Sequence, residues 1–222
     1  MVRDLDTAVR LQVYASLAAT GSAPSVRDLA EGSAWRPDDV RSALHRLAEQ
    51  RLVVLDHDDA VLMAHPFATV PLGFSVMGSS TLWWGGCAWD SFAIPHLVTT
   101  EPDVLVATRC PGCERALSWV VGRHAPPSGD EVAHFLVPVA RMWDDILHTC
   151  GHQRLFCSVG CVDRWLDSSG MPRGYVMDLG TLWRLAEHWY DGRLAADYTR
   201  REPSDAREYF RGVGLTGSFW GL

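Results

Sequence analysis

The sequence predicts an α+β protein: a winged-helix-like segment of three helices over residues 1–65, followed by a mixed α/β domain over residues 66–222. Up to about residue 65, apolar residues recur mainly at helical spacing, whereas extended apolar runs interrupted by Pro and Gly follow. The chain of 222 residues is long enough for one large domain or two small ones, without disulfide bonds to support the core.

The first part is predicted to contain three helices and a hairpin. Residues 5–19 place apolar side chains on one helical face, and a short second helix is expected over 25–35. Pro37 is suited to the first turn of a third helix, which carries a second apolar stripe. Two apolar runs, 52–56 and 60–64, flank a polar turn and predict the hairpin.

A winged helix has two interpretations, DNA binding or a structural role, and the charge favours the second. The net charge of −7 argues against a nucleic-acid partner and against an anionic membrane surface. The third helix mixes both signs of charge: Arg41, Arg46 and Arg51 with Asp38, Asp39 and Glu49.

The second part is predicted to combine a sheet with further helices. A strand entering a helix is expected over 154–170, and a helix over 178–194, with Asp178 as its N-cap. The Gly-rich tail after Pro203 is expected to be loosely ordered. The sheet is expected to take strands from residues near 70–80, 104–122 and 132–140.

The N-terminal stretch lacks the pattern of a signal peptide, and no apolar run reaches membrane-spanning length. We therefore expect a cytoplasmic protein that has no membrane partner. Six cysteines in a reducing compartment indicate packing, metal binding or chemistry rather than disulfide bonds.

The segment WWGGCAWDSFAIPH, residues 83–96, is the first candidate for chemistry. If a helix begins just after the two glycines, Cys87 lies in its first turn, where a helix N-terminus favours the thiolate and lowers the cysteine pKa. Asp90 would share that helix face, so a sulfur and a proton carrier would meet. The alternative is an inert buried cysteine beside an ordinary surface carboxylate.

The segment RCPGCER is the second candidate. Cys110 and Cys113 are spaced as one half of a zinc site on a tight turn. A thioredoxin-like dithiol has the same spacing, but the residues that follow resemble a returning strand rather than a helix. Inert thiols are the remaining alternative. Candidates for further zinc ligands are His148, Cys150, His152, Cys157 and Cys161.

These motifs resemble the organomercurial lyase (alkylmercury lyase) family. The first matching motif is Cys87-Ala88-Trp89-Asp90 with a proline at position 95, and the second is the pair Phe156-Cys157. A cysteine between them, here Cys110, also matches. The resemblance implies the fold of that family, with Cys87, Asp90 and Cys157 as catalytic residues. Three further thiols depart from the family pattern: Cys113, Cys150 and Cys161.

The implied activity is protonolytic cleavage of a carbon–mercury bond, giving a hydrocarbon and Hg(II). Cys87 and Cys157 would hold the soft metal in transit, and Asp90 would deliver a proton to carbon. No cofactor is required beyond a candidate structural zinc, and small thiols or a mercuric reductase would accept the Hg(II). Two alternatives remain open: a biosynthetic enzyme that reuses the Cys/Asp/Cys site, and a thiol-rich winged-helix metal sensor.

Overall fold

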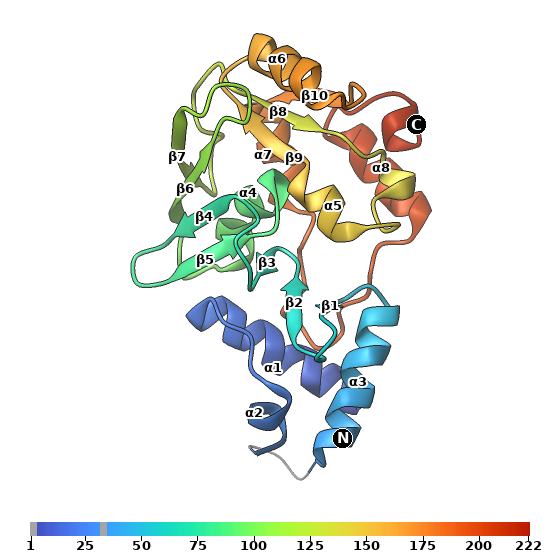
Figure 1. Cartoon of the computed structure of the whole chain (residues 1–222). Coiled ribbons are helices and arrows are strands. Elements are labelled where there is room, and N and C mark those ends of the chain that lie inside the picture. The colour runs from blue at the N-terminus through green and yellow to red at the C-terminus, as the bar shows by residue number, and fades with distance from the viewer. Residues whose placement is uncertain (1–3, 32–34) are drawn as a thin grey trace.

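The computed structural model describes residues 4–31 and 35–222. Figure 1 shows the helices of the N-terminal part gathered at one end of the molecule, with most strands of the remaining chain on the other side. The part of the second-helix prediction that falls on residues 32–34 lies outside the described residues. The first elements are α1 (Leu5–Thr20), α2 (Val26–Glu31), α3 (Pro37–Glu49), β1 (Val54–Leu55) and β2 (Val61–Ala64).

The apolar stripes of α1 and α3 account for their packing. Val9, Val13 and Leu17 are fully buried on α1, and the predicted stripe of α3 is buried as well. Pro37 occupies the first turn of α3, as predicted, because a proline there loses no helical hydrogen bond.

A seven-stranded antiparallel sheet joins the two parts of the chain. Its strand order is β1-β2-β3-β5-β4-β6-β7, so the hairpin of the first part continues directly into the strands of the second. One hydrogen-bonded sheet therefore crosses the expected boundary at residue 65. The added strands are β3 (Phe67–Ala68), β4 (Phe74–Met77), β5 (Leu82–Gly85), β6 (Asp103–Arg109) and β7 (Ala116–Gly122).

A second sheet of three strands has the order β10-β8-β9. The prediction that residues 132–140 join the first sheet is therefore wrong. β8 pairs instead with two strands that follow it in the chain, and such long-range pairing leaves no local signal. The strands are β8 (Val132–Phe135), β9 (Gln153–Phe156) and β10 (Tyr175–Asp178).

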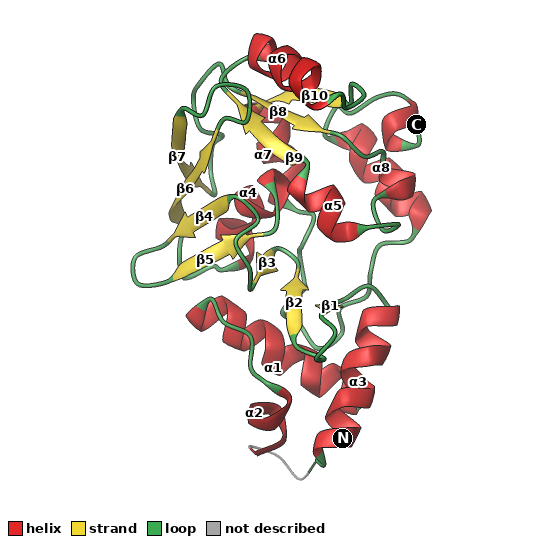
Figure 2. Ribbon diagram, in the orientation of Figure 1, coloured by secondary structure: helices red, strands yellow, loops and turns green. Residues whose placement is uncertain are grey.

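Helix α4 (Ala88–Leu97) is the central helix, and Figure 2 shows it between the two groups of strands. Every residue of α4 except His96 is buried, which explains why its apolar residues form no single stripe. Helix α7 (Leu179–Glu187) packs on it and begins at Asp178, whose carboxylate accepts from the Thr181 N–H as predicted.

The tail is ordered, contrary to the prediction. It forms α8 (Pro203–Gly212) and a short 3₁₀ helix, η2 (Ser218–Trp220). Trp220 and Phe210 are almost completely buried, so aromatic burial outweighs the flexibility of the intervening glycines. No helix within the described residues is long and apolar enough to cross a membrane. The remaining elements are η1 (Val139–Arg141), α5 (Ile146–Gly151) and α6 (Val159–Ser169).

Candidate active site

Cys87 and Asp90 lie where β5 turns into α4. Cys87 is the N-cap of α4, and its sulfur accepts from the Asp90 N–H at 3.4 Å. The preceding glycines permit this close turn: a Cβ on Gly85 would lie 2.0 Å from Ser91 Oγ, and one on Gly86 would lie 2.3 Å from Asp90 Oδ2. The two glycines thus let a carboxylate pack directly against the backbone.

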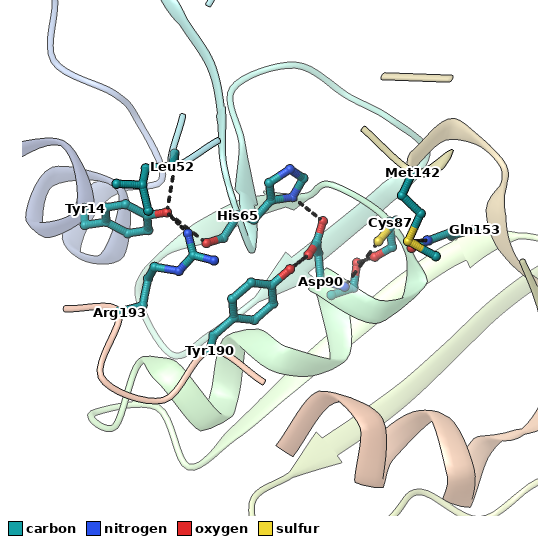
Figure 3. A network of polar contacts seen from close by, with 10 residues as sticks. Tyr14, Leu52, His65, Cys87, Asp90, Met142, Gln153, Tyr190 and Arg193 are labelled. Atoms are coloured by element: carbon teal, nitrogen blue, oxygen red, sulfur yellow. Dashed lines mark hydrogen bonds and ion pairs between the residues drawn. The ribbon is translucent and has the colours of Figure 1, made fainter. Parts of the chain in front are cut away.

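Two buried side chains hold the Asp90 carboxylate. His65 Nδ1 lies 3.0 Å from Oδ2, and the Tyr190 hydroxyl donates to Oδ1 (Figure 3). Asp90 itself is 1% exposed. Three separate segments therefore meet at this carboxylate. The loop after β2 supplies His65, α4 supplies Asp90, and the segment after α7 supplies Tyr190.

The thiol beside Cys87 is that of Cys150, on α5. The two thiols share a hydrogen bond, and both residues are buried. The Cys150 sulfur, an Asp90 oxygen and a His65 ring nitrogen lie within 4.8 Å of one another. Cys87, Cys150 and Asp90 line one cavity of about 400 Å³.

Cys157 lies elsewhere, contrary to the expectation that it would meet Cys87 and Asp90. It is absent from the cavity lining, and its sulfur is 3.5 Å from that of Cys113. The reason is the strand between the two candidates: Cys150 precedes β9 and Cys157 follows it. The four residues of β9 span roughly 13 Å at the usual rise per residue, so the two thiols lie at opposite ends.

Burial raises the pKa values of the cavity thiols. The pKa of Cys87 rises well above its ordinary value because of burial, then because of its hydrogen bond with Cys150 and the Asp90 charge. The hydrogen bond from Cys87 lowers the pKa of Cys150, but burial and the Asp90 charge raise it overall. The expected lowering at the helix N-terminus is therefore overturned, because desolvation outweighs the helix dipole.

Aromatic rings form another part of the cavity lining. Trp89, which the sequence placed near the site, lies 4.8 Å from Trp189 between ring centroids and also contacts the rings of Phe210 and Trp220. Trp143 contacts the imidazole of His65 edge-on at 5.7 Å. These rings give part of the cavity an apolar surface.

The sequence did not reveal the roles of His65 and Tyr190. Both come from segments far from Asp90 in the chain, and neither forms part of a short motif. Cys150 belongs to a segment rich in His and Cys that the sequence did mark as a candidate for metal binding. The spacing of its cysteines could not show whether Cys150 or Cys157 lies beside Cys87.

The model of the alkylmercury lyase family (MerB) matches residues 67–191, which is more than half of the chain and includes Cys87, Asp90, Cys150 and Cys157. The chain belongs to the alkylmercury lyase family. As an alkylmercury lyase it is an enzyme that cleaves carbon–mercury bonds, and neither the sensor nor the biosynthetic alternative is favoured.

A solved structure titled as the mercury-bound form of MerB2 shares the fold. The match has a TM-score of 0.65 at 17% sequence identity and covers 87% of this chain and 93% of that one. A comparison with curated protein sequences gives no match. The mixed α+β architecture of this alkylmercury lyase thus follows that of a known relative.

Proposed function

We propose that Cys87, Cys150 and Asp90 form the catalytic centre of this lyase, which converts an organomercurial into a hydrocarbon and Hg(II). The supporting observation is the single cavity in which two buried thiols adjoin a carboxylate held by His65 and Tyr190. Soft thiolates bind Hg(II) in preference to oxygen or nitrogen ligands, so a thiol pair is a suitable mercury site.

Capture of the substrate replaces thiol protons by mercury. The organomercury cation arrives on a small thiolate, which leaves with the Cys87 proton as the Cys87 sulfur bonds mercury. The Cys150 sulfur then bonds mercury as well, and its proton passes to Asp90. The closeness of the Cys150 sulfur to an Asp90 oxygen supports this transfer.

Protonation of carbon completes the reaction. With two sulfur donors on mercury, the electron pair of the carbon–mercury bond moves to carbon, and the Asp90 proton forms the new C–H bond. Mercury stays in the +2 state throughout, so no redox cofactor takes part. We propose that two small thiols, or a mercuric reductase, take up the Hg(II) and return protons to Cys87 and Cys150.

Benzene release from phenylmercury in excess thiol tests the assignment. Cys87→Ser and Cys150→Ser should abolish turnover, because a serine hydroxyl binds soft Hg(II) poorly. Asp90→Asn should still bind phenylmercury but lose about 10²–10⁴-fold in turnover, since it has no proton to deliver. Asp144→Asn, which removes an exposed carboxylate outside the cavity, is the matched control and should keep wild-type turnover.

Cys150→Ser and Cys157→Ser separate the two assignments of the second thiol. Folded Cys157→Ser protein, verified by circular dichroism, should still release benzene, whereas folded Cys150→Ser protein should not. The reverse pattern would restore Cys157 as the second catalytic thiol.

We infer that the N-terminal helices form a winged-helix-like unit that supports the cavity and does not bind DNA. Basic side chains on or beside α3 are paired with carboxylates: Arg36 with Asp39, Arg41 with Asp38, and Arg46 with Asp6. Fluorescence anisotropy with duplex DNA should show no salt-dependent binding; a specific operator affinity would contradict this role.

All six cysteines are free, which supports a reducing, cytoplasmic setting.

A further inference from the structure

Four cysteines outside the catalytic cavity converge on one point. The sulfurs of Cys110, Cys113, Cys157 and Cys161 all lie within 4.8 Å of one another. The first two lie on the turn between β6 and β7, and the other two lie where β9 enters α6. Two chain segments from different sheets thus contribute one pair each.

The backbone around this cluster is shaped for close approach. A Cβ on Gly112 would lie 2.1 Å from the Cys161 carbonyl oxygen, so the Pro-Gly turn fits against α6 only with glycine at this position. The Cys157 N–H donates to the Cys110 sulfur at 3.4 Å, and Arg164 donates to the Cys161 sulfur at 2.9 Å. Metal-bound sulfurs accept such N–H donors as part of the shell around the ion.

We propose that these four cysteines hold one zinc ion in a tetrahedral site. With Zn–S bonds of about 2.3 Å, tetrahedral geometry places the sulfurs about 3.8 Å apart, which is close to the observed arrangement. The other candidate ligands, His148, Cys150 and His152, are not members of the cluster. The ion links the β6–β7 hairpin of the first sheet to β9 of the second, remote from the cavity.

Metal analysis of protein purified without a chelator or polyhistidine tag tests this proposal. Wild-type protein should carry about one zinc per chain, and Cys150→Ser, which removes a cavity thiol, should carry the same amount. Cys113→Ser should lose zinc to a weak chelator that leaves the wild-type metal in place, and should unfold at a lower temperature. Co(II) substitution should give the visible bands of a tetrahedral tetrathiolate.

Three results would overturn the zinc site. One is folded wild-type protein with less than about a tenth of an equivalent of zinc, since a closed structural site retains its metal. A second is one equivalent of iron in place of zinc. The third is a Cys113–Cys157 disulfide, found by mass spectrometry in protein purified under reducing conditions.

Independently, an unpaired group of arginines lines the catalytic cavity. Asp90 is the one carboxylate among the lining residues. In the described part of the chain, no ion pair joins any of these arginines to an Asp or Glu. The arginines are Arg51, Arg193, Arg200, Arg201 and Arg207.

Aromatic rings, rather than carboxylates, lie against most of these cations. The guanidinium groups of Arg51 and Arg200 lie 5.6 and 5.3 Å from the Trp143 ring centroid. Arg193 is buried among tyrosine rings, and its Nε has no hydrogen-bond partner. Partial burial, and then the charges of Arg193 and Arg51, lower the pKa of Arg200. Five arginines thus share the cavity with one carboxylate, and none of them is ion-paired within the described residues.

We infer that this arginine group receives a carboxylate carried by the substrate. This inference rests on the proposed function. The carboxylate can belong to the organic group on mercury or to the small thiol that delivers it, because both enter the same cavity. Guanidinium groups bind carboxylates through charge-assisted, often bidentate hydrogen bonds.

Four substrate combinations test this inference and separate the two sources. Phenylmercury and 4-carboxyphenylmercury are each supplied with 2-mercaptoethanol or with mercaptosuccinate, and kcat/KM is measured from hydrocarbon release. A carboxylate on the responsible partner should raise kcat/KM about tenfold, and added salt should reduce that gain. Arg200→Gln should remove the gain, so its loss of kcat/KM should be much larger for the carboxylate-bearing pair than for the neutral pair.

Arg141→Gln is the matched control, because Arg141 is paired with Asp144 and does not line the cavity. Equal kcat/KM for all four combinations would overturn the inference, as would an equal loss for neutral and anionic pairs in Arg200→Gln. Failure of the proposed function looks different, since the neutral pair would then release no benzene.

Discussion

At the scale of single residues, the cavity depends on close contacts that the two glycines before Cys87 permit. Gly86 leaves room for the Asp90 carboxylate, and His65 and Tyr190 fix that carboxylate from two other segments. Burial favours the protonated thiols, because it raises the pKa values of Cys87 and Cys150. In the proposed mechanism the sulfurs therefore become thiolates at the moment of capture, beside a carboxylate that can take the proton.

Gly86→Ala should reduce turnover about 10–100-fold, because its Cβ would lie 2.3 Å from Asp90 Oδ2 and 2.6 Å from Met63 Cε. The carboxylate would have to move away from His65 or Tyr190. Benzene release at saturating phenylmercury measures the effect. Gly180→Ala is the control, since a Cβ there makes only ordinary contacts at 3.5 Å, and equal turnover in the two variants would contradict the role of Gly86.

The raised thiol pKa values predict a loss of stability at alkaline pH. The unfolded chain releases thiol protons near pH 8.5, while the folded chain retains those of Cys87 and Cys150, so the folded state binds more protons. The free energy of unfolding should therefore fall as pH rises above about 8.5. Urea denaturation at about pH 7.5 and 9.5 should show a smaller fall for Cys87→Ala than for wild type; identical falls would contradict the prediction.

At the scale of elements, local patterns in the sequence predicted those parts whose partners are also local. The stripe of α3, the Pro37 start and the Asp178 cap follow from spacing within one helix. The C-P-G-C turn joins two strands, as its flanking residues indicated. In each case the deciding contact lies within a few residues of the pattern.

The features that the sequence did not predict depend on contacts between residues far apart in the chain. β8 joins the second sheet through strands that follow it, and β9 separates Cys150 from Cys157. The tail forms helices because Trp220 is buried against the rings of Trp89 and Phe210. A single sequence contains these partners but no spacing that identifies them, so it could not show that Cys150, rather than Cys157, lies in the cavity beside Cys87.

Trp220→Ala should lower the free energy of unfolding by about 3–5 kcal/mol, because the ring is completely buried and its removal leaves a cavity. The variant should also release benzene more slowly, since Trp220 closes part of the catalytic cavity. Thermal melts and turnover measure the two effects. Leu194→Ala, at a side chain that is 37% exposed, should change neither much, and comparable losses in both variants would contradict the role of the tail.

At the scale of the whole molecule, the N-terminal helices and the catalytic cavity form one hydrogen-bonded unit. Arg10, on α1, donates to the Arg193 and Ala195 carbonyls at 2.7 Å each. The seven-stranded sheet makes a second connection, because β2 pairs with β3 on either side of His65. The segment that carries Tyr190 and Arg193 is thus held against the first part of the chain.

Tyr14→Phe tests this coupling, because the Tyr14 hydroxyl lies at its centre. It accepts from Arg193 at 3.0 Å and lies 3.1 Å from both the Leu52 and His65 carbonyl oxygens (Figure 3). Loss of the hydroxyl leaves buried partners unsatisfied, which should cost about 1–3 kcal/mol of stability. Because His65 and Arg193 both line the cavity, kcat/KM for phenylmercury should fall as well.

Tyr175→Phe is the control, since no hydrogen bond of its hydroxyl is found among the described residues. A Tyr14→Phe enzyme that is destabilised but keeps wild-type kcat/KM would show that the helices support folding alone, and that the cavity does not depend on them.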